Sequence, residues 1–260
     1  MKGCFNLSLL DTLKRLERMN RKVFCIGLSR TGTTSLAHAL NNIGIPTIRY
    51  SLEAFVQIDK IDETQFLDIK LELSMLQKWS LKKEIKAKNV RRIEGILNSY
   101  EGFADLPFPM LYRILSDKYP DAYFIYTYRD KSSWLKSMEW LYNDAAVIWQ
   151  HGHLDNAIMQ WAYGTSVYKE SILSEAYENH HINVNKFFEG ADNFLSVKID
   201  DGELTYDRLT RFLGLSIKIG PVERLNQPTE PTSEERKRYW RKKNNGLFML
   251  INKIVSYVRR

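Results

Sequence analysis

"VFCIGLSRTGTTSLAHAL", residues 23–40, combines an apolar run, a turn rich in Gly, Ser and Thr, and a segment typical of a helix. The continuous apolar residues at its start suit a parallel strand that is buried on both faces. The segment "TSLAHALNNIG", residues 34–44, fits a helix that ends at Gly44, since glycine commonly follows the last residue of a helix. A buried strand that leads through such a turn into a helix predicts the first part of a βαβ unit in an α/β protein.

The turn comes close to the consensus of phosphate-binding P-loops, G-x-x-x-x-G-K-[ST]. Gly27 and Gly32 stand at the two glycine positions, but Thr33 replaces the lysine. The unpaired N–H groups and the positive dipole end of the next helix would bind a phosphate, and the guanidinium of Arg30 would add a bidentate cation. We therefore predict a phosphate-binding site formed by Gly27, Ser29, Arg30, Thr31, Gly32, Thr33, Thr34 and Ser35.

Outward from the turn, strands and helices continue to alternate. Strands are predicted at residues 45–50, 122–129 and 193–199, with a further strand end within 99–107, and helices at 6–19, 51–100, 108–120, 131–180 and 204–215. This order favours a single three-layer α/β domain with a mainly parallel central sheet, similar to P-loop NTPases. We expect that domain to cover residues 1–225 and a basic linker and helix to cover residues 226–260, beginning at "NQPTEPTS".

Composition narrows the function classes. The chain has 260 residues and a formal net charge of +7, which favours an anionic ligand or surface. It contains no run of eighteen apolar residues, so no transmembrane span is predicted, and the first 22 residues lack a signal-peptide cleavage site. A cytoplasmic location is therefore expected. Cys4 and Cys25 are too far apart for a CxxC pair, and the five histidines lack metal-type spacing, so no metal site is predicted.

Two motifs resemble the family of sulfotransferases that use 3′-phosphoadenosine 5′-phosphosulfate (PAPS). "GLSRTGTTSL" followed by "ALNNIGIP" resembles the 5′-phosphosulfate loop of the branch that reads G-x-x-R-[TS]-G-T-T-S-L. The second signature of the family is a strand that ends in Arg, with Ser eight residues later, and "YFIYTYRDKSSWLKSM" has Arg129 and Ser137 at that spacing. "GFADLPFPMLYRIL" and "SVKIDDGELTYDRLTRFLGL" extend the resemblance, which covers residues 22–215. Arg49 and Tyr50 depart from it, since a His often follows the second strand in this branch.

The resemblance implies an enzyme that transfers the sulfuryl group of PAPS to a hydroxyl or amine and releases 3′,5′-ADP without a metal. Arg129 and Ser137 would hold the 3′-phosphate, and Arg30 would stabilise the oxygen that bridges sulfur and phosphate. Asp105 is the leading candidate for the general base, although Asp is also a favoured helix N-cap and that alternative stays open. His151 and His153 in "WQHGHLDN" are the second choice. The sequence identifies neither the acceptor nor the oligomeric state.

Two other function classes compete with this interpretation. The first is a P-loop kinase or NTPase, in which Asp130 after the strand "YFIYTYR" would hold Mg²⁺; the missing lysine argues against it. The second is a protein that binds membranes or nucleic acid through the basic segment 236–260, in which Leu247, Phe248, Leu250, Ile251, Ile254 and Val255 would form one apolar stripe. We expect the partners to be the nucleotide and an acceptor, with no nucleic acid, and contact with an anionic membrane through the C-terminal helix is the remaining alternative.

Overall fold

This computed structural model describes residues 21–49, 93–149, 151, 153–225 and 227–244. Its centre is a five-stranded sheet in the order β2-β3-β1-β4-β5. The strands are β1 (Val23–Cys25), β2 (Thr47–Arg49), β3 (Gly102–Ala104), β4 (Tyr123–Tyr128) and β5 (Phe194–Lys198). All four strand pairs are parallel. The predicted fold class is confirmed, and the described sheet is parallel throughout rather than only mainly so.

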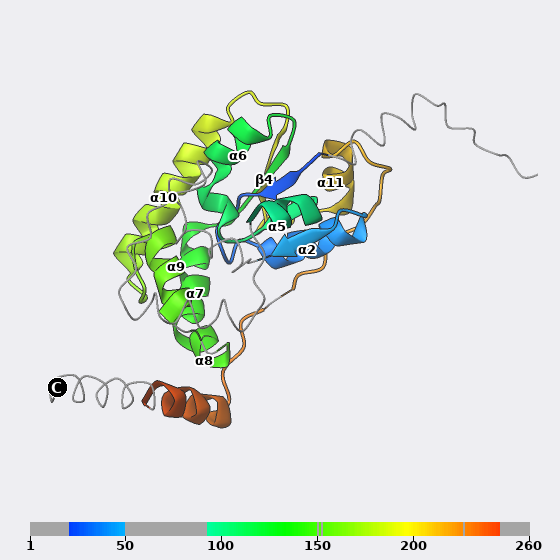
Figure 1. Cartoon of the computed structure of the whole chain (residues 1–260). Helices are drawn as coiled ribbons and strands as arrows, with labels where there is room; N and C mark the ends of the chain where they lie inside the picture. The colour runs from blue at the N-terminus through cyan, green and yellow to red at the C-terminus, as the bar shows by residue number, and fades with distance from the viewer. Residues whose placement is uncertain (1–20, 50–92, 150, 152, 226, 245–260) are drawn as a thin grey trace, which may run out of the picture.

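Helices cover both faces of the sheet (Figure 1). They are α2 (Thr33–Asn42), α5 (Ile93–Ser99), α6 (Tyr112–Lys118), α7 (Lys131–Trp140), α8 (Ala146–Ile148), α9 (His153–Tyr163), α10 (Glu170–Phe187) and α11 (Tyr206–Phe212). Successive strand residues point to opposite faces. Cys25 accordingly packs in one core with Leu36 of α2 and Leu209 of α11, whereas Phe24 lies in the second core with residues of α6, α7 and α10. The sheet and the helices on its two faces thus form three layers, with one core on each side of the sheet.

Several boundaries differ from the predicted ones. Each strand occupies only part of its apolar run, and the helix predicted at 108–120 is divided into a 3₁₀-helix, Phe108–Met110, and α6. Pro109 lies in the first turn of the 3₁₀-helix, whose bonds span three residues, from the N–H of Leu111 to the carbonyl of Phe108. The helical prediction for 131–180 is realised as α7 to α10, interrupted by a π-helix at Leu141–Ala145. The helices predicted at 6–19 and over most of 51–100 fall outside the described residues.

The turn between β1 and α2 lies tightly against the end of β4. A Cβ atom on Gly27 would come within 2.2 Å of the Thr127 hydroxyl oxygen and 2.4 Å of the Thr127 carbonyl oxygen, so only glycine fits there. Gly32 has a φ of 86° and is the N-cap of α2, with no side-chain bond to cap the helix. The sequence therefore needs its two glycines for two different reasons, close approach at the first and a left-handed backbone at the second.

After α11, the described part of the chain runs toward α7 and continues into a further helix (Figure 1). Residues 233–244 are helical and begin with a capping box, in which the Thr232 N–H donates to the Glu235 carboxylate and the Glu235 N–H donates to the Thr232 hydroxyl. The apolar stripe predicted at 247–255 falls outside the described residues. No helix in the described ranges is long and apolar enough to cross a membrane.

Candidate functional site

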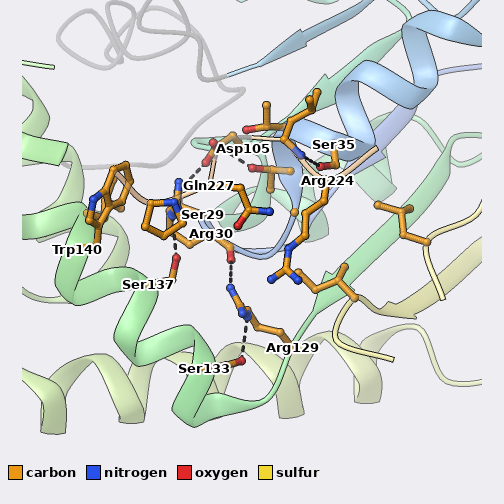
Figure 2. A pocket seen from close by; sticks show the side chains of 18 of the residues that line it. Ser29, Arg30, Ser35, Asp105, Arg129, Ser133, Ser137, Trp140, Arg224 and Gln227 are labelled. Carbon is orange, nitrogen blue, oxygen red and sulfur yellow. Dashed lines mark hydrogen bonds between the residues drawn. The ribbon is translucent and has the colours of Figure 1, made fainter. Parts of the chain in front are cut away.

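A cavity of about 1090 Å³ lies beside the turn, at the carboxyl ends of β1, β3, β4 and β5 (Figure 2). This edge is the usual ligand position in open parallel sheets. The turn, α7, the segment after β5 and residues 221–225, 227 and 228 all contribute to its wall. The Arg, Lys, Asp and Glu residues along that wall are Arg30, Arg49, Arg129, Lys136 and Arg224, with Asp105, Asp155, Asp200 and Glu223. Five cations concentrated on one cavity provide a site for a ligand with several anionic groups.

The turn is held in place by core side chains before any ligand arrives. The backbone N–H of Ser29 donates to the Tyr163 hydroxyl (3.1 Å), and the Trp134 indole donates to the Ser29 carbonyl (2.9 Å). Both rings are at least 98% buried. The Thr31 hydroxyl donates to the Leu28 carbonyl at 2.7 Å, within the turn itself. The uncapped start of α2 is thus presented to the cavity on a rigid support, and its first-turn N–H groups have no acceptor within the helix.

Arg30 lies between the turn and α7. Its Nε donates to the Ser137 hydroxyl (2.9 Å), and its guanidinium carbon lies 4.5 Å from the centre of the Trp140 ring. Burial lowers the pKa of Arg30 to about 10, against the charge of Asp105, which raises that pKa. The side chain therefore stays cationic at neutral pH, while its partial burial strengthens its field on an anionic ligand.

Asp105 follows β3 and faces the turn. One carboxylate oxygen accepts from the Ser29 hydroxyl (2.6 Å) and the other from the Thr33 hydroxyl (3.2 Å). The N-cap of the 3₁₀-helix is Pro107 and that of α6 is Leu111. Asp105 therefore does not fill the helix N-cap position that its sequence context left open, and its carboxylate reaches the predicted phosphate loop instead.

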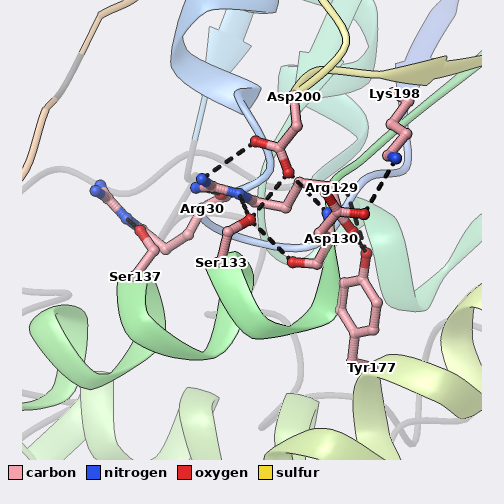
Figure 3. Close-up of polar contacts among 8 residues, drawn as sticks. All are labelled: Arg30, Arg129, Asp130, Ser133, Ser137, Tyr177, Lys198 and Asp200. Atoms are coloured by element: carbon pink, nitrogen blue, oxygen red, sulfur yellow. Dashed lines mark hydrogen bonds and ion pairs between the residues drawn. The ribbon is translucent and has the colours of Figure 1, made fainter.

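The structure distributes Arg129 and Ser137 differently from their pairing in the sequence (Figure 3). The Nε of Arg129 donates to the hydroxyl of Ser133 (2.9 Å), and one Nη donates to the Arg30 carbonyl (3.4 Å). Ser137, one turn further along α7, bonds to Arg30. Both serines line the cavity, so the two arginines lie side by side with one serine each.

Asp200 occupies the space between Arg129 and the N-terminus of α7 (Figure 3). It forms an ion pair with Arg129 (3.3 Å) and accepts from the backbone N–H of Asp130 (2.7 Å) and the hydroxyl of Ser133 (2.9 Å). Burial alone would raise the pKa of Asp200, but these hydrogen bonds and the charges of Arg129 and Arg224 hold it below its usual value. An internal carboxylate thus already bonds to the donors that an anionic ligand would use.

Sequence reasoning missed several residues of the cavity wall. Besides Asp200 and Ser133, these are Lys136, Trp140 and Arg224, and Arg49 was noted only as a departure from the family. Arg49 extends from the end of β2, and its guanidinium donates to the Thr34 hydroxyl. Helical spacing from Ser137 offered a signal for Ser133 and Trp140, which lie one turn away on α7. Nothing in the local sequence of Arg224 or Asp200 indicates that they approach Arg129.

Of the two candidate histidines, His151 lies at the cavity. His151 lines the cavity with Asp155 and lies 5.8 Å from the ring of Trp149. Burial lowers the pKa of His151, while the charge of Asp155 raises it, and the net shift is downward. The side chain of His153 is outside what the structure describes. In the described ranges, no group of three or more His, Cys, Asp or Glu could hold a metal ion.

Comparison with known proteins identifies the family of this chain. Residues 22–230 match the family model of the sulfotransferase domain, so the chain belongs to the sulfotransferase family. A protein of Aspergillus versicolor, Ava biosynthesis cluster protein M, is 30% identical over 118 residues, which are 45% of this chain and 42% of that protein. The chain thus matches less than half the length of that curated relative.

Two solved sulfotransferases are structurally similar over most of this chain. The enzyme of Alicyclobacillus acidocaldarius has 15% identity and a TM-score of 0.45, with 84% of this chain and 89% of that chain covered. The mouse sulfotransferase SULT7A1, solved with PAP, has 16% identity and a TM-score of 0.40, with 85% of this chain and 62% of that chain covered.

Proposed function

We propose that this sulfotransferase uses PAPS as donor, transfers its sulfuryl group to a hydroxyl or amine of an acceptor, and releases 3′,5′-ADP. The observation that carries the proposal is the pairing of two anion-binding positions in one cavity. One is the uncapped start of α2 with Arg30, and the other is Arg129 with Ser133 at the start of α7. A nucleotide with phosphates at both ends of its ribose fits such a pair. Family membership favours sulfuryl transfer over the kinase alternative.

The 5′ end of the donor is assigned to the turn. Thr33, Thr34, Ser35 and the N–H groups at the start of α2 would bind the 5′-phosphate, as expected at a helix N-terminus. Arg30 would stabilise the charge that builds on the bridging oxygen when the S–O bond breaks, the role that a preorganised cation fills in such reactions. Gly27, Ser29, Thr31 and Gly32 contribute through the shape of the turn. Sulfuryl transfer of this kind depends on positioning and electrostatics more than on covalent chemistry.

The 3′-phosphate is assigned to Arg129. The Ser133 hydroxyl accepts a hydrogen bond from this arginine, whereas the Ser137 hydroxyl accepts one from Arg30. Arg224 belongs to the same wall, and its charge lowers the pKa of Asp200 beside Arg129. We add Arg224 and Ser133 to the candidate 3′-phosphate ligands.

Asp105 remains our candidate for the general base. Its oxygens already accept from Ser29 and Thr33, and a carboxylate has lone pairs for further donors. His151 is the alternative, on the side of the cavity where Trp140, Trp149 and Met159 would contact an acceptor. Asp105→Asn and His151→Gln distinguish the two. If Asp105 is the general base, Asp105→Asn abolishes the ascending limb of the pH–rate profile and His151→Gln leaves that limb in place; if His151 is the base, the two results are exchanged.

The proposed donor is tested most directly by calorimetric titration with 3′,5′-ADP and with Mg–ATP. We expect 3′,5′-ADP to bind equally well with EDTA and with Mg²⁺, and more tightly than Mg–ATP. Tighter binding of Mg–ATP, or a strict need for Mg²⁺, would overturn the proposal. 5′-AMP is the matched control, because it lacks only the 3′-phosphate assigned to Arg129.

We also infer peripheral contact of the C-terminal helix with anionic membranes. Residues 236–244 include Arg236, Lys237, Arg238, Arg241, Lys242 and Lys243, and the Trp240 ring among them is 54% exposed. Basic residues around an exposed tryptophan suit a helix at a lipid interface. Lys242→Glu with Lys243→Glu should reduce sedimentation with phosphatidylserine vesicles, whereas Lys169→Glu with Lys186→Glu, which makes the same charge change at the two ends of α10, should not. Equal sedimentation of all three proteins would contradict the inference.

A further inference from the structure

Among the residues described, Trp140, the last residue of α7, is the one wall residue that contacts Arg30, another aromatic ring and the C-terminal chain together. The Arg30 guanidinium lies over one face of its ring, 4.5 Å from the ring centre. The ring of Trp149 meets it edge to face at 5.4 Å. Its indole N–H donates to the carbonyl of Thr229 at 2.6 Å. Trp140 therefore joins the proposed catalytic arginine to a segment almost ninety residues further along the chain.

That segment, residues 221–225 and 227–232, forms a strap along one side of the cavity. The N–H of Leu225 donates to the hydroxyl of Ser35 (2.9 Å), which ties the strap to the first turn of α2. The bond from Trp140 to Thr229 ties it to α7. Beyond the strap, Arg236 pairs with Asp144 at 3.2 Å. The strap is thus attached to both elements that hold the proposed donor site.

The π-helix Leu141–Ala145 begins directly after Trp140. A π-turn contains one residue more than an α-turn, and each residue rotates an α-helix by about 100°. The extra residue changes the direction in which Asp144 projects, and Asp144 is the residue that pairs with Arg236. Turns of this type occur frequently at functional sites. Here Trp140 at the end of α7 contacts Arg30, and Asp144 in the π-helix that follows contacts the C-terminal helix.

We propose that Trp140 is a positioning residue that holds Arg30 in its productive orientation and is itself held by the strap. The inference rests on the proposed function, because it concerns the orientation of the cation assigned to the bridging oxygen. An arginine side chain has many rotamers, and a cation–π contact at a partly buried site is worth about 0.5–2 kcal/mol. Loss of that contact leaves the charge of Arg30 in the cavity, but the guanidinium is no longer held in one orientation. Turnover should therefore fall more than nucleotide affinity.

The test compares Trp140→Leu and Trp140→Phe with the wild type. The rate is the single-turnover release of labelled sulfate from PAPS, with water in place of the acceptor: water adds to the sulfuryl group, the S–O bond to the 5′-phosphate breaks, and 3′,5′-ADP leaves. Trp140→Leu should lower this rate roughly 2–30-fold, the range that the cation–π energy implies. Trp140→Phe keeps a ring and should recover part of the rate. The affinity for 3′,5′-ADP should stay within about twofold in both variants.

Two controls separate a positioning role from a structural one. In an Arg30→Ala background, Trp140→Leu should cause no further loss of rate, because residues that act through one another are not additive. Trp161→Leu removes a partly buried indole of α9 outside the cavity wall and should leave the rate unchanged. An NMR spectrum provides a further readout. The side-chain N–H resonance of Arg30 is identified as the one that is missing in Arg30→Ala, and it should shift in Trp140→Leu because the ring current of the indole is lost.

A wild-type rate in Trp140→Leu, or an equal further loss in the Arg30→Ala background, would overturn the inference. If Trp140→Leu fails to fold, Trp140→Phe is compared with the wild type instead, by its single-turnover rate and by the shift of its Arg30 resonance. These outcomes leave binding of 3′,5′-ADP intact. Failure of the wild type to bind 3′,5′-ADP would instead overturn the proposed function, and this inference with it.

Discussion

Arg30 and Asp105 share a backbone conformation that residues with side chains seldom adopt. Their φ angles are 70° and 67°, in the left-handed region, where a non-glycine residue costs on the order of 1–3 kcal/mol. Both are held by several contacts, Arg30 by Ser137 and Trp140, and Asp105 by the Ser29 hydroxyl and the Leu106 N–H. Strain of this kind persists only where surrounding bonds support it, and it is common at functional sites. The two residues proposed for the chemistry are the two described non-glycine residues with positive φ.

At the residue scale, Arg30→Ala and Arg129→Ala should have different kinetic effects. Arg30→Ala should lower the single-turnover rate at saturating PAPS by about 10²-fold with a smaller change in nucleotide affinity, because its contact strengthens as the leaving oxygen gains charge. Arg129→Ala should chiefly weaken binding of both PAPS and 3′,5′-ADP. Titration with 3′,5′-ADP alongside the single-turnover rate measures both. An unchanged affinity in Arg129→Ala would refute its assignment to the 3′-phosphate.

At the element scale, the N-terminus of α7 is arranged around an internal anion. Asp200, just after β5, bonds to Arg129, to the Asp130 N–H and to Ser133, so that β5 and α7 are joined through one carboxylate. A 3′-phosphate assigned to Arg129 would meet this negative charge. The strength of nucleotide binding should therefore depend on Asp200 even though no direct bond to the ligand is assigned to it.

Asp200→Asn should bind 3′,5′-ADP roughly 3–10-fold more tightly at low ionic strength, with a smaller gain at high salt, because a like charge is removed beside the phosphate. Calorimetry at two salt concentrations measures the effect. Asp201→Asn is the matched control: it makes the same charge change at the next residue, whose carboxylate pairs with Lys198 and is absent from the cavity wall. Weaker binding in Asp200→Asn would mean that the carboxylate mainly orients Arg129.

Helix α10 packs against the sheet through a buried histidine. The ring of His180 is 8% exposed, and its Nε2–H donates to the carbonyl of Ile26 at the end of β1 (2.9 Å). Burial lowers the pKa of His180 to about 4, because the charged ring would lose its hydration. The folded state therefore requires neutral His180, and the hydrogen bond fixes its tautomer.

The unfolded chain binds a proton at His180 below pH 6.5, whereas the folded chain does so only near pH 4, so stability should fall as the pH falls through that window. The loss should be roughly 2–3 kcal/mol. Urea unfolding at pH 4.5 and pH 7 measures it. His180→Gln keeps an N–H donor without a titrating ring, so its stability should vary less between the two pH values. Equal pH dependence in the variant and the wild type would contradict the assignment.

At the scale of the whole molecule, one sheet separates two cores that share β1. Cys25 lies in the core below α2 and α11, is fully buried, and its burial raises the pKa of its thiol. A thiol reagent reaches it only when the domain opens. The proposed ligand, which contacts both α2 and α7, should therefore stabilise the domain as a unit.

In a Cys4→Ser background, labelling of Cys25 by a thiol reagent should report this opening. A 3′,5′-ADP concentration of 100 times Kd should slow labelling by about 100-fold, which corresponds to about 2.7 kcal/mol of stabilisation. The same concentration of 5′-AMP should protect less. A fast labelling rate that is the same with and without 3′,5′-ADP would show that Cys25 becomes accessible without opening of the donor site.

The sequence predicted the parts of this protein that depend on local pattern. An apolar run before "GLSRTGTTSL" was sufficient for a buried parallel strand, the turn and the start of α2, because glycine spacing and periodicity act over a few residues. The family resemblance extended the prediction to Arg129 and Ser137, and the α/β class followed from the alternation of strands and helices. Boundaries were less accurate, as at Pro109, because the choice between 3₁₀ and α geometry depends on packing around the residues involved.

Only the tertiary structure decided which side chains meet. Parallel strands bring their carboxyl ends to one edge regardless of distance along the chain, so Asp105, Arg129 and Asp200 converge there although almost a hundred residues separate the first from the last. The pairing of Ser137 with Arg30 rather than with Arg129 depends on the rotation of α7 against the turn. Thr229 reaches Trp140 because the chain returns across the cavity. The sequence by itself determined the conformation of the turn between β1 and α2, through local backbone constraints, whereas the contacts between distant side chains depend on how the layers pack.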